Sequence, residues 1–325
     1  MKISKIRGLV AALFAAVTVV APGASIASAN TEITFWSWRT EDKAFYESQI
    51  KLFEAKNPGI TVKFTPYLNT EYNAIVATAL TAGKGPDVLQ MRPYGGMANL
   101  SDAGNFMPLT TADVPALKKL PAGILAGAQG YKDKKQYGLP YAVSALGVMY
   151  NPDILEKAGV RALPQTWAQL QTAFDKVKKA GFLPLGNAGG NGPALEQLHA
   201  TVGPTFYGGT AFFNDVVAGK KTFTDKGYVA SLKAVADLAK WMPANYQGID
   251  YNTARGLFAN EKAAFYIGGN YEIGYFRSLN PSITIGWFPA PKANAGAKRY
   301  VGTWADGAYA INAKTTQKAA ALKLI

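Results

Sequence analysis

Few side chains in this sequence could act as nucleophiles or as metal ligands. The chain of 325 residues has no cysteine and a single histidine, His199. A Ser–His or Cys–His nucleophile would depend on that one imidazole, and a thiolate site or a histidine-rich metal site is impossible. His199 follows Leu195 and Leu198 on a short helical pattern, which favours a structural role. We therefore expect neither a metal ion nor a cofactor.

Carboxylates are the remaining candidates for catalysis. The acidic residues near predicted loops are Glu41, Glu196, Glu272 and Asp306. Hydrolysis of a glycosidic bond needs two such groups close together on a cleft. No motif fixes their spacing, so a secreted carbohydrate-active enzyme stays an open alternative. Residues 219–222 (GKKT) are not a phosphate loop, because lysine stands where serine or threonine belongs.

Aromatic residues are the most distinctive feature of the sequence. There are 17 tyrosines, 16 phenylalanines and 6 tryptophans. Many follow predicted strands or lie in glycine-rich loops: Trp36, Trp38, Tyr94, Tyr141, Tyr207, Tyr271 and Trp304. Ligands of open α/β sheets bind outside the carboxyl ends of the strands, and flat aromatic faces suit the apolar faces of sugar rings. Any one of these rings could instead pack in a core, but the set favours a sugar-binding cleft.

The periodicity of the first hundred residues predicts a β-α-β-α-β order. Strands are expected over residues 31–38, 60–64 and 85–89, and amphipathic helices in the two intervals between them. A second alternating region follows residue 155. This order predicts an α/β fold in which open, mainly parallel sheets carry helices on both faces.

Residues 136–155 (QYGLPYAVSALGVMYNPDIL) connect these two regions. Residues 139–150 are twelve nearly uncharged residues, which is about twice the usual length of a strand and well short of a membrane helix. We interpret them as one extended segment that passes between two lobes, with a ligand bound beside this hinge. A single overlong core strand is the alternative.

The first 29 residues have the pattern of a secretory signal peptide. Lys2, Lys5 and Arg7 precede an apolar stretch, and an Ala-Ser-Ala site predicts a mature start at Asn30. Because cysteine is absent, there is no lipobox. Removal of three basic residues and no acid lowers the net charge from +13 to +10. The remaining lysines are scattered, so we expect no nucleic-acid partner.

Several segments, in this order, resemble the family 1 extracellular solute-binding proteins. They are GKGPDV at 83–88, YGLPYAVSALGVMYNPDILEKAGV at 137–160, FANEKAAFYIGGNY at 258–271, and GWFPAPKANAG with YVGTWADGAYAINA between 286 and 313. This family comprises the maltose-binding-protein-like receptors of carbohydrate ABC importers. The resemblance implies a two-lobed, type II-like periplasmic-binding-protein fold with the ligand cleft at the hinge. It also implies a membrane permease that reads the closed form.

The resemblance can be carried over to individual positions. The ligand-binding residues that it and the aromatic pattern indicate are Trp38, Arg39, Glu41, Arg92, Tyr94, Tyr141, Ser144, Tyr207, Asn270, Tyr271, Trp304 and Asp306. Trp38, Tyr271 and Trp304 would stack on sugar. Arg92, Asp306, Asn270 and Glu41 would bind hydroxyls. Maltose binders have an acid at the position of Ser144, so maltose itself is not implied.

The sequence therefore predicts a monomeric periplasmic subunit that binds a carbohydrate without bond chemistry. One lobe is expected over residues 30–143 and 287–312, and the other over 144–286 and 313–325. Family members are longer, so we expect a missing C-terminal part. A receptor for an anionic sugar derivative or a polyol phosphate is a further alternative, because Arg39, Arg92 and the positive net charge are compatible with it.

Overall fold

Alternating patterns in the first hundred residues produce the parallel part of the N-terminal lobe. The computed structural model describes residues 30–190 and 192–325, so the expected signal peptide lies outside the described residues. β1 (Thr31–Ser37) pairs in parallel with β2 (Ile60–Pro66) and with β3 (Val88–Met91). β8 (Thr303–Ile311) and the first part of β4 (Gly138–Tyr150) complete this sheet as antiparallel strands, in the order β2-β1-β3-β8-β4.

Helices cover both faces of this sheet because its strands alternate their apolar side chains. Ile33 and Phe35 of β1 pack with Tyr46 of α1 (Lys43–Lys56), whereas Leu89 of β3 packs with Val76 of α2 (Tyr72–Thr81). The other helical segments of the lobe are short: η1 (Thr40–Asp42), α3 (Gly95–Asp102), η2 (Pro115–Lys119), α4 (Ala122–Leu125), η3 (Ala126–Ala128) and α13 (Lys318–Leu324).

The C-terminal lobe is built around the second part of β4. This part pairs antiparallel with β6 (Ala263–Gly269) and β7 (Gly286–Phe288), and β6 pairs in parallel with β5 (Leu183–Leu185). The surrounding helices are α5 (Pro152–Lys157), α6 (Trp167–Lys179), α7 (Gly192–Val202), α8 (Pro204–Tyr207), α9 (Thr210–Val217), α10 (Lys226–Asp237), η4 (Leu238–Trp241), η5 (Tyr246–Gly248), α11 (Tyr251–Ala259) and α12 (Glu272–Leu279).

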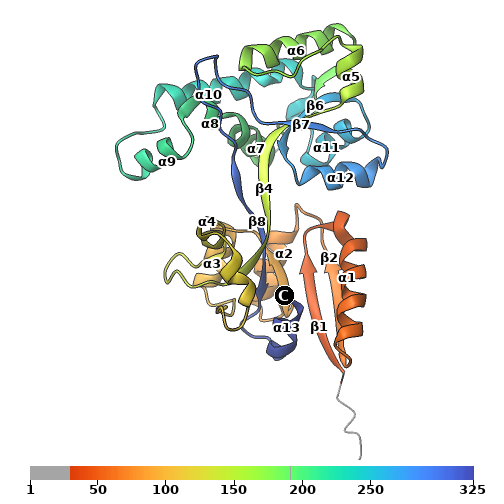
Figure 1. Ribbon diagram of the computed structural model, residues 1–325, viewed down its shortest axis with the longest axis vertical. Helices are drawn as coiled ribbons and strands as arrows, with labels where there is room; N and C mark the ends of the chain where they lie inside the picture. The colour runs from red at the N-terminus through yellow and green to blue at the C-terminus, as the bar shows by residue number, and fades with distance from the viewer. Residues whose placement is uncertain (1–29, 191) are drawn as a thin grey trace, which may run out of the picture.

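β4 and β8 cross side by side from one lobe to the other (Figure 1). Residues 138–145 of β4 pair with β8, and residues 146–150 pair with the C-terminal sheet. The apolar run is long because it serves two sheets, which confirms the interpretation of a segment between two lobes. The register of β4 against β8 shifts between Pro140 and Val143.

The structure differs from the sequence-based expectation in three places. Both sheets are mixed rather than mainly parallel, because the crossing strands run antiparallel to their neighbours. Residues 287–288 belong to the C-terminal lobe, where Phe288 packs in the core. Residues 313–325 were expected in the C-terminal lobe. Instead α13 packs on the N-terminal sheet, since β8 returns the chain to that lobe and Ala321 contacts the cluster of Ile33.

One glycine in the crossing strands yields a stability prediction. A Cβ on Gly307 would overlap the hydroxyl of Tyr141, whose ring stacks on Tyr309 at 4.5 Å. We expect Gly307→Ala to lower the free energy of unfolding in urea by about 1–3 kcal/mol. Gly123→Ala is the control, because a Cβ on this helical glycine meets nothing within 4 Å, and it should be neutral or stabilising. Equal stabilities of the two variants would contradict the packing argument.

Candidate functional site

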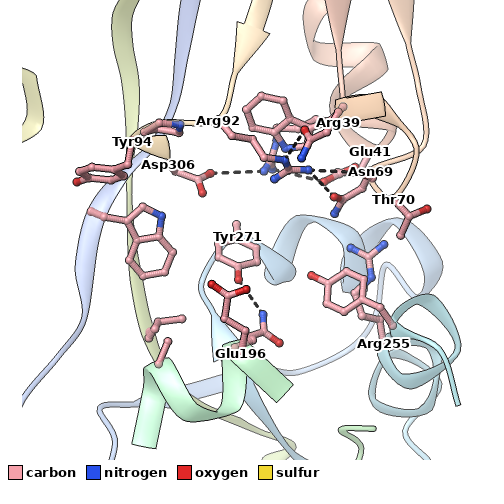
Figure 2. A pocket seen from close by; sticks show the side chains of 18 residues that line it. Arg39, Glu41, Asn69, Thr70, Arg92, Tyr94, Glu196, Arg255, Tyr271 and Asp306 are labelled. Atoms are coloured by element: carbon pink, nitrogen blue, oxygen red, sulfur yellow. Dashed lines mark hydrogen bonds and ion pairs between the residues drawn. The ribbon is translucent and has the colours of Figure 1, made fainter. Parts of the chain in front are cut away.

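A cavity of about 530 Å³ lies between the lobes, beside the crossing strands (Figure 2). Both lobes contribute to its walls. The N-terminal lobe provides Trp38, Arg39, Glu41, Asn69, Thr70, Asn73, Arg92, Pro93 and Tyr94. The C-terminal lobe provides Glu196, Gln197, Ala200, Tyr251, Arg255 and Tyr271, and the crossing strands provide Leu146, Trp304 and Asp306. The size and the mixed lining are those of a small-molecule site.

The N-terminal wall is formed where the parallel strands end. Trp38 and Arg39 follow β1, Asn69 follows β2, and Arg92 follows β3. The carboxyl ends of these three strands share one edge of the sheet because the strands are parallel. This edge faces the C-terminal lobe, so the topology itself gathers residues that are distant in sequence.

Arg39 is the centre of an ionic cluster at this edge. Its Nε donates to Asp42, its Nη2 lies 3.7 Å from Glu41 Oε1, and its Nη1 lies 3.9 Å from Asp306 Oδ2. Burial disfavours the charged guanidinium, but the hydrogen bond to Asp42 and the nearby carboxylates outweigh it and raise the pKa of Arg39. Arg39 therefore stays charged and holds the acids in place.

Asp306 is a carboxylate that the cavity keeps partly desolvated. Burial raises the pKa of its carboxyl, while Arg39, a hydrogen bond with Ser144 and the charge of Arg92 partly oppose that shift. Ser144 itself is buried and does not line the cavity. Its role in the structure is thus to orient Asp306 from the neighbouring strand.

Arg92 is held by neutral partners. Its Nε donates to Asn73 Oδ1 at 3.0 Å, its Nη2 donates to Asn69 Oδ1 at 2.6 Å, and its guanidinium lies 4.6 Å from the ring centre of Trp38. Among the described residues no carboxylate lies within 4 Å of it. Burial lowers the pKa of Arg92, opposed mainly by Asp306. Trp38 is only 4% exposed, so it serves mainly as a platform for Arg92.

Tyr94 reaches the cavity from a strained backbone conformation. Its φ is 58° and its ψ is −127°, a region that favours glycine. Such a conformation costs about 1–3 kcal/mol and persists where the surroundings impose it. The backbone N–H of Tyr94 donates to Gly127 O at 2.6 Å, which is one such constraint. The side chain is 37% exposed.

The opposite wall presents rings and amides. The rings of Tyr271 and Trp304 meet edge to face at 6.4 Å, and Gln197 Nε2 donates to the Tyr271 hydroxyl at 2.7 Å. Figure 2 shows Tyr271, Glu196 and Arg255 facing the group formed by Arg39, Arg92 and Asp306. A ligand in the cavity would therefore contact both lobes at once.

Three residues expected in the site lie outside the cavity lining, in addition to Ser144. Tyr141 stacks on Tyr309 and its hydroxyl is buried without a partner. Asn270 exchanges hydrogen bonds with the backbone of Ala145, which ties the end of β6 to β4. Tyr207 belongs to an aromatic cluster with Phe212 and Tyr228, because α8 packs on α10. These three side chains are therefore structural.

His199 has the structural role that the sequence indicated, and Asp87 is structural as well. His199 Nε2 lies 2.8 Å from the Ser231 hydroxyl, and burial lowers the pKa of its imidazole. Asp87 accepts from the backbone N–H and the hydroxyl of Thr34 at 2.8 and 2.7 Å, which joins β1 to the segment before β3. Neither side chain lines the cavity.

Part of the cavity lining is not predicted by the sequence. Asn69 and Thr70 follow β2, so the strand-end argument could have found them. Tyr251 and Arg255 lie one turn apart on α11, a spacing that places both on one helix face. Nothing in the sequence distinguishes that face from any other helix face. Gln197 and Ala200 on α7 have no sequence signal at all.

Across residues 30–190 and 192–325, no group of three or more His, Cys, Asp or Glu side chains could hold a metal ion. Within the same residues, no helix is long and apolar enough to cross a membrane.

Comparison with known proteins identifies the class. The family model described as bacterial extracellular solute-binding protein matches residues 36–325, so the chain belongs to this family. It is 27% identical over 303 residues to the multiple sugar-binding protein of Streptococcus mutans, an alignment that covers 90% of this chain and 70% of that protein.

Solved structures share the fold. A solved structure from work on xylan utilization by Caldanaerobius polysaccharolyticus superposes on this chain with a TM-score of 0.79 at 22% identity. The alignment covers 90% of this chain and 76% of the solved chain. The solute-binding protein RafE in complex with raffinose superposes with a TM-score of 0.74 at 23% identity, with the same coverage. These likenesses confirm the two-lobed fold.

The environment of Asp306 predicts how stability depends on pH. The pKa of the Asp306 carboxyl is raised in the folded protein, so ionisation of this group lowers the free energy of unfolding. This loss of stability develops as the pH rises above the ordinary carboxyl pKa of about 4. We expect Asp306→Asn to raise the melting temperature of the empty protein at pH 7 by about 1–3 °C. The difference should vanish near pH 3.

Asp113→Asn is the control with the opposite sign. Hydrogen bonds from Thr110 lower the pKa of the exposed Asp113 carboxyl, so this variant should be less stable than the wild type at pH 7. A less stable Asp306→Asn variant at pH 7 would show that Arg39 outweighs burial at Asp306.

Proposed function

We propose that this chain captures a neutral sugar or oligosaccharide between its lobes and delivers it unaltered to an ABC importer permease. The observation that carries the proposal is the composition of the cavity, in which aromatic rings and hydrogen-bonding groups from both lobes face one enclosed space. Sugar hydroxyls that lose water need partners, and the amides, arginines and carboxylates of the two walls can supply them. The sugar-binding relatives support the same reading.

The charge of the cavity favours a neutral ligand. Two of the arginines that line the cavity already have carboxylate partners: Arg39 is paired with Glu41, Asp42 and Asp306, and Arg255 is paired with Glu272. A ligand with a net charge would meet a site that is already balanced, whereas hydroxyl groups can both donate and accept between these ions.

Arg92 supports a second candidate, a receptor for an anionic sugar derivative or a polyol phosphate. Since its partners are the side chains of Asn69 and Asn73 and the ring of Trp38, an anionic group of a ligand could pair with it. Asp306 argues against this candidate, because its carboxylate contributes negative charge at the same wall.

We assign stacking to Trp304, Tyr271 and Tyr94 in preference to Trp38, whose ring is covered by Arg92. Hydroxyl recognition is assigned to Arg92, Asp306 and Glu41, together with Asn69 and Gln197. Flat rings cover the apolar face of a pyranose, and charged groups bind its edge.

Binding without bond chemistry is part of the proposal. Glu41 and Asp306 both lie within 4 Å of Arg39, which orients both carboxyl groups as hydrogen-bonding partners for a ligand. The multiple sugar-binding protein that the chain resembles supports binding alone. We further propose a periplasmic monomer, secreted through a cleaved signal peptide and recognised by its permease when the lobes close on ligand.

A thermal-shift panel tests the proposal, because a ligand that binds only the native state raises its melting temperature. The probes are raffinose, lactose, maltotriose and xylotriose as neutral sugars, and glucuronate and glucose 6-phosphate as anions. We expect stabilisation by at least one neutral sugar and little change of its affinity between about 50 and about 500 mM salt. The bound sugar should be recovered unaltered.

The opposite results identify the alternatives. Stabilisation by the anions alone, with an affinity that falls steeply as salt increases, would support the second candidate. Turnover of the sugar that is abolished by Asp306→Asn would show an enzyme. No stabilisation by any neutral sugar would contradict the proposed function.

Trp304 provides a test at the level of one residue. We expect Trp304→Ala to weaken sugar binding by about tenfold or more in isothermal titration, because a ring face in the cavity is lost. The circular dichroism spectrum should stay that of the wild type. Tyr131→Ala, which removes an exposed ring outside the cavity, is the matched control. An unchanged dissociation constant would remove Trp304 from the site.

A further inference from the structure

A buried carboxylate lies directly behind the wall of the C-terminal lobe. Glu272 is the first residue of α12 and is 0% exposed. Three side chains donate to it. The Tyr251 hydroxyl and Gln197 Nε2, at 3.2 Å, reach its Oε1, and Arg255 Nη1 reaches its Oε2 at 3.3 Å. Burial raises the pKa of the Glu272 carboxyl, and the charge of Arg255 opposes this.

All three donors line the cavity, whereas Glu272 does not. They come from two different helices, α7 and α11. One carboxylate outside the cavity therefore holds three side chains that would meet a ligand.

These bonds determine which way the protons of the wall point. Tyr251 has a single proton, which it donates to Glu272, so toward the cavity its oxygen can only accept. Gln197 donates to both Glu272 and Tyr271, and its Oε1 accepts from Tyr266 at 3.3 Å. The Tyr271 oxygen accepts from Gln197, so its own proton is available to a ligand.

We infer that Glu272 is a positioning residue that sets which groups of this wall donate and which accept hydrogen bonds from the sugar. The inference rests on the proposed function, because it concerns recognition of hydroxyl groups at the same site. Tyr271 serves a ligand oxygen that accepts, and Tyr251 serves a ligand hydroxyl that donates. The hydrogen-bonding specificity of the C-terminal wall is thus set by Glu272, which does not itself line the cavity.

Replacing the carboxylate by an amide reverses these roles. In Glu272→Gln the guanidinium of Arg255, which has only donors, takes the amide oxygen, and the new NH₂ group faces Tyr251 and Gln197. Gln197 then turns its carbonyl oxygen away from Tyr266, toward the new NH₂ group and toward Tyr271, and its own NH₂ group donates to the Tyr266 hydroxyl oxygen. Tyr271 donates its proton to that oxygen, and the proton of Tyr251 is released to the cavity.

The experiment uses analogues of the panel sugar that gives the largest thermal shift. Each analogue carries fluorine in place of one hydroxyl, because fluorine accepts a hydrogen bond but cannot donate one. For the wild type, we expect fluorination of the sugar hydroxyl that contacts Tyr251 to weaken binding about three- to tenfold, because one hydrogen bond is lost. Fluorination of the sugar hydroxyl that contacts Tyr271 should weaken binding less. In Glu272→Gln the larger loss of affinity should occur at the Tyr271 position and the smaller loss at the Tyr251 position.

Tyrosine variants identify the two positions. The sugar hydroxyl that contacts Tyr251 is the one whose fluorination no longer weakens binding to the Tyr251→Phe variant. The sugar hydroxyl that contacts Tyr271 is identified in the same way with Tyr271→Phe. Asp175→Asn is the matched control. It removes a carboxylate bonded to Trp241 at 2.8 Å in the same lobe and away from the cavity, and it should leave the profile unchanged.

If every fluorinated analogue loses affinity for Glu272→Gln by the same factor relative to the wild type, the inference is overturned and Glu272 is a structural residue. If Glu272→Gln does not fold, Gln197→Leu tests the same network. This variant should change the cost at the Tyr271 position and not at the Tyr251 position, and an unchanged profile would again overturn the inference. If no sugar of the panel binds, the proposed function itself fails.

Discussion

The continuous hydrogen-bonded ladder of β4 and β8 is the constraint on which the rest of the molecule depends. β4 gives its first residues to one sheet and its last residues to the other, so two separately packed cores are joined through backbone rather than through side chains. The pairing is irregular only between Pro140 and Val143, which is where the ladder can bend with the least loss of hydrogen bonds. Each wall of the cavity is therefore attached to the separately packed core of its own lobe.

The cavity holds charges that a core would exclude. Arg39 and Asp306 are each only about one-sixth exposed, and Arg92 is held by asparagine side chains and the Trp38 ring. Partly buried charges cost free energy unless neighbours solvate them. In this cavity neighbouring side chains satisfy only some of the donors and acceptors of these charged groups. The remaining donors and acceptors point into the space between the lobes. The cost to the empty protein and the capacity to bind thus have one physical origin.

The sequence predicted the parts of this structure that depend on local pattern. Alternating residues such as Ile33 and Phe35 indicated β1, and the uncharged run of β4 indicated a strand shared by two lobes. Thr166 and Gln169 form a capping box at the start of α6, which is likewise a local pattern of residue types. The fate of the last residues depends on how β8 returns to the first lobe, and no local pattern contains that information.

Only part of the site could be predicted from the sequence, for a related reason. Residues at strand ends, such as Arg92, can be placed from topology, and Trp304 and Asp306 from the family resemblance. Whether a ring faces a cavity or packs depends on contacts between distant segments. Arg92 covers Trp38, and α10 covers Tyr207. Side chains from helix faces, such as Arg255, carry no mark in the sequence that separates them from solvent-facing residues.

The route of the chain also has a consequence for the order in which the protein folds. In the N-terminal sheet β8 lies between β3 and β4, and it pairs Ile311 with Val88 and Ala310 with Gly138. The N-terminal sheet therefore lacks the strand between β3 and β4 until nearly all of the described chain has been synthesised. Contacts so distant along the chain slow folding, because loop closure precedes any gain from pairing. The C-terminal sheet also depends on pairing between distant segments, since Val148 of β4 pairs with Ile267 of β6.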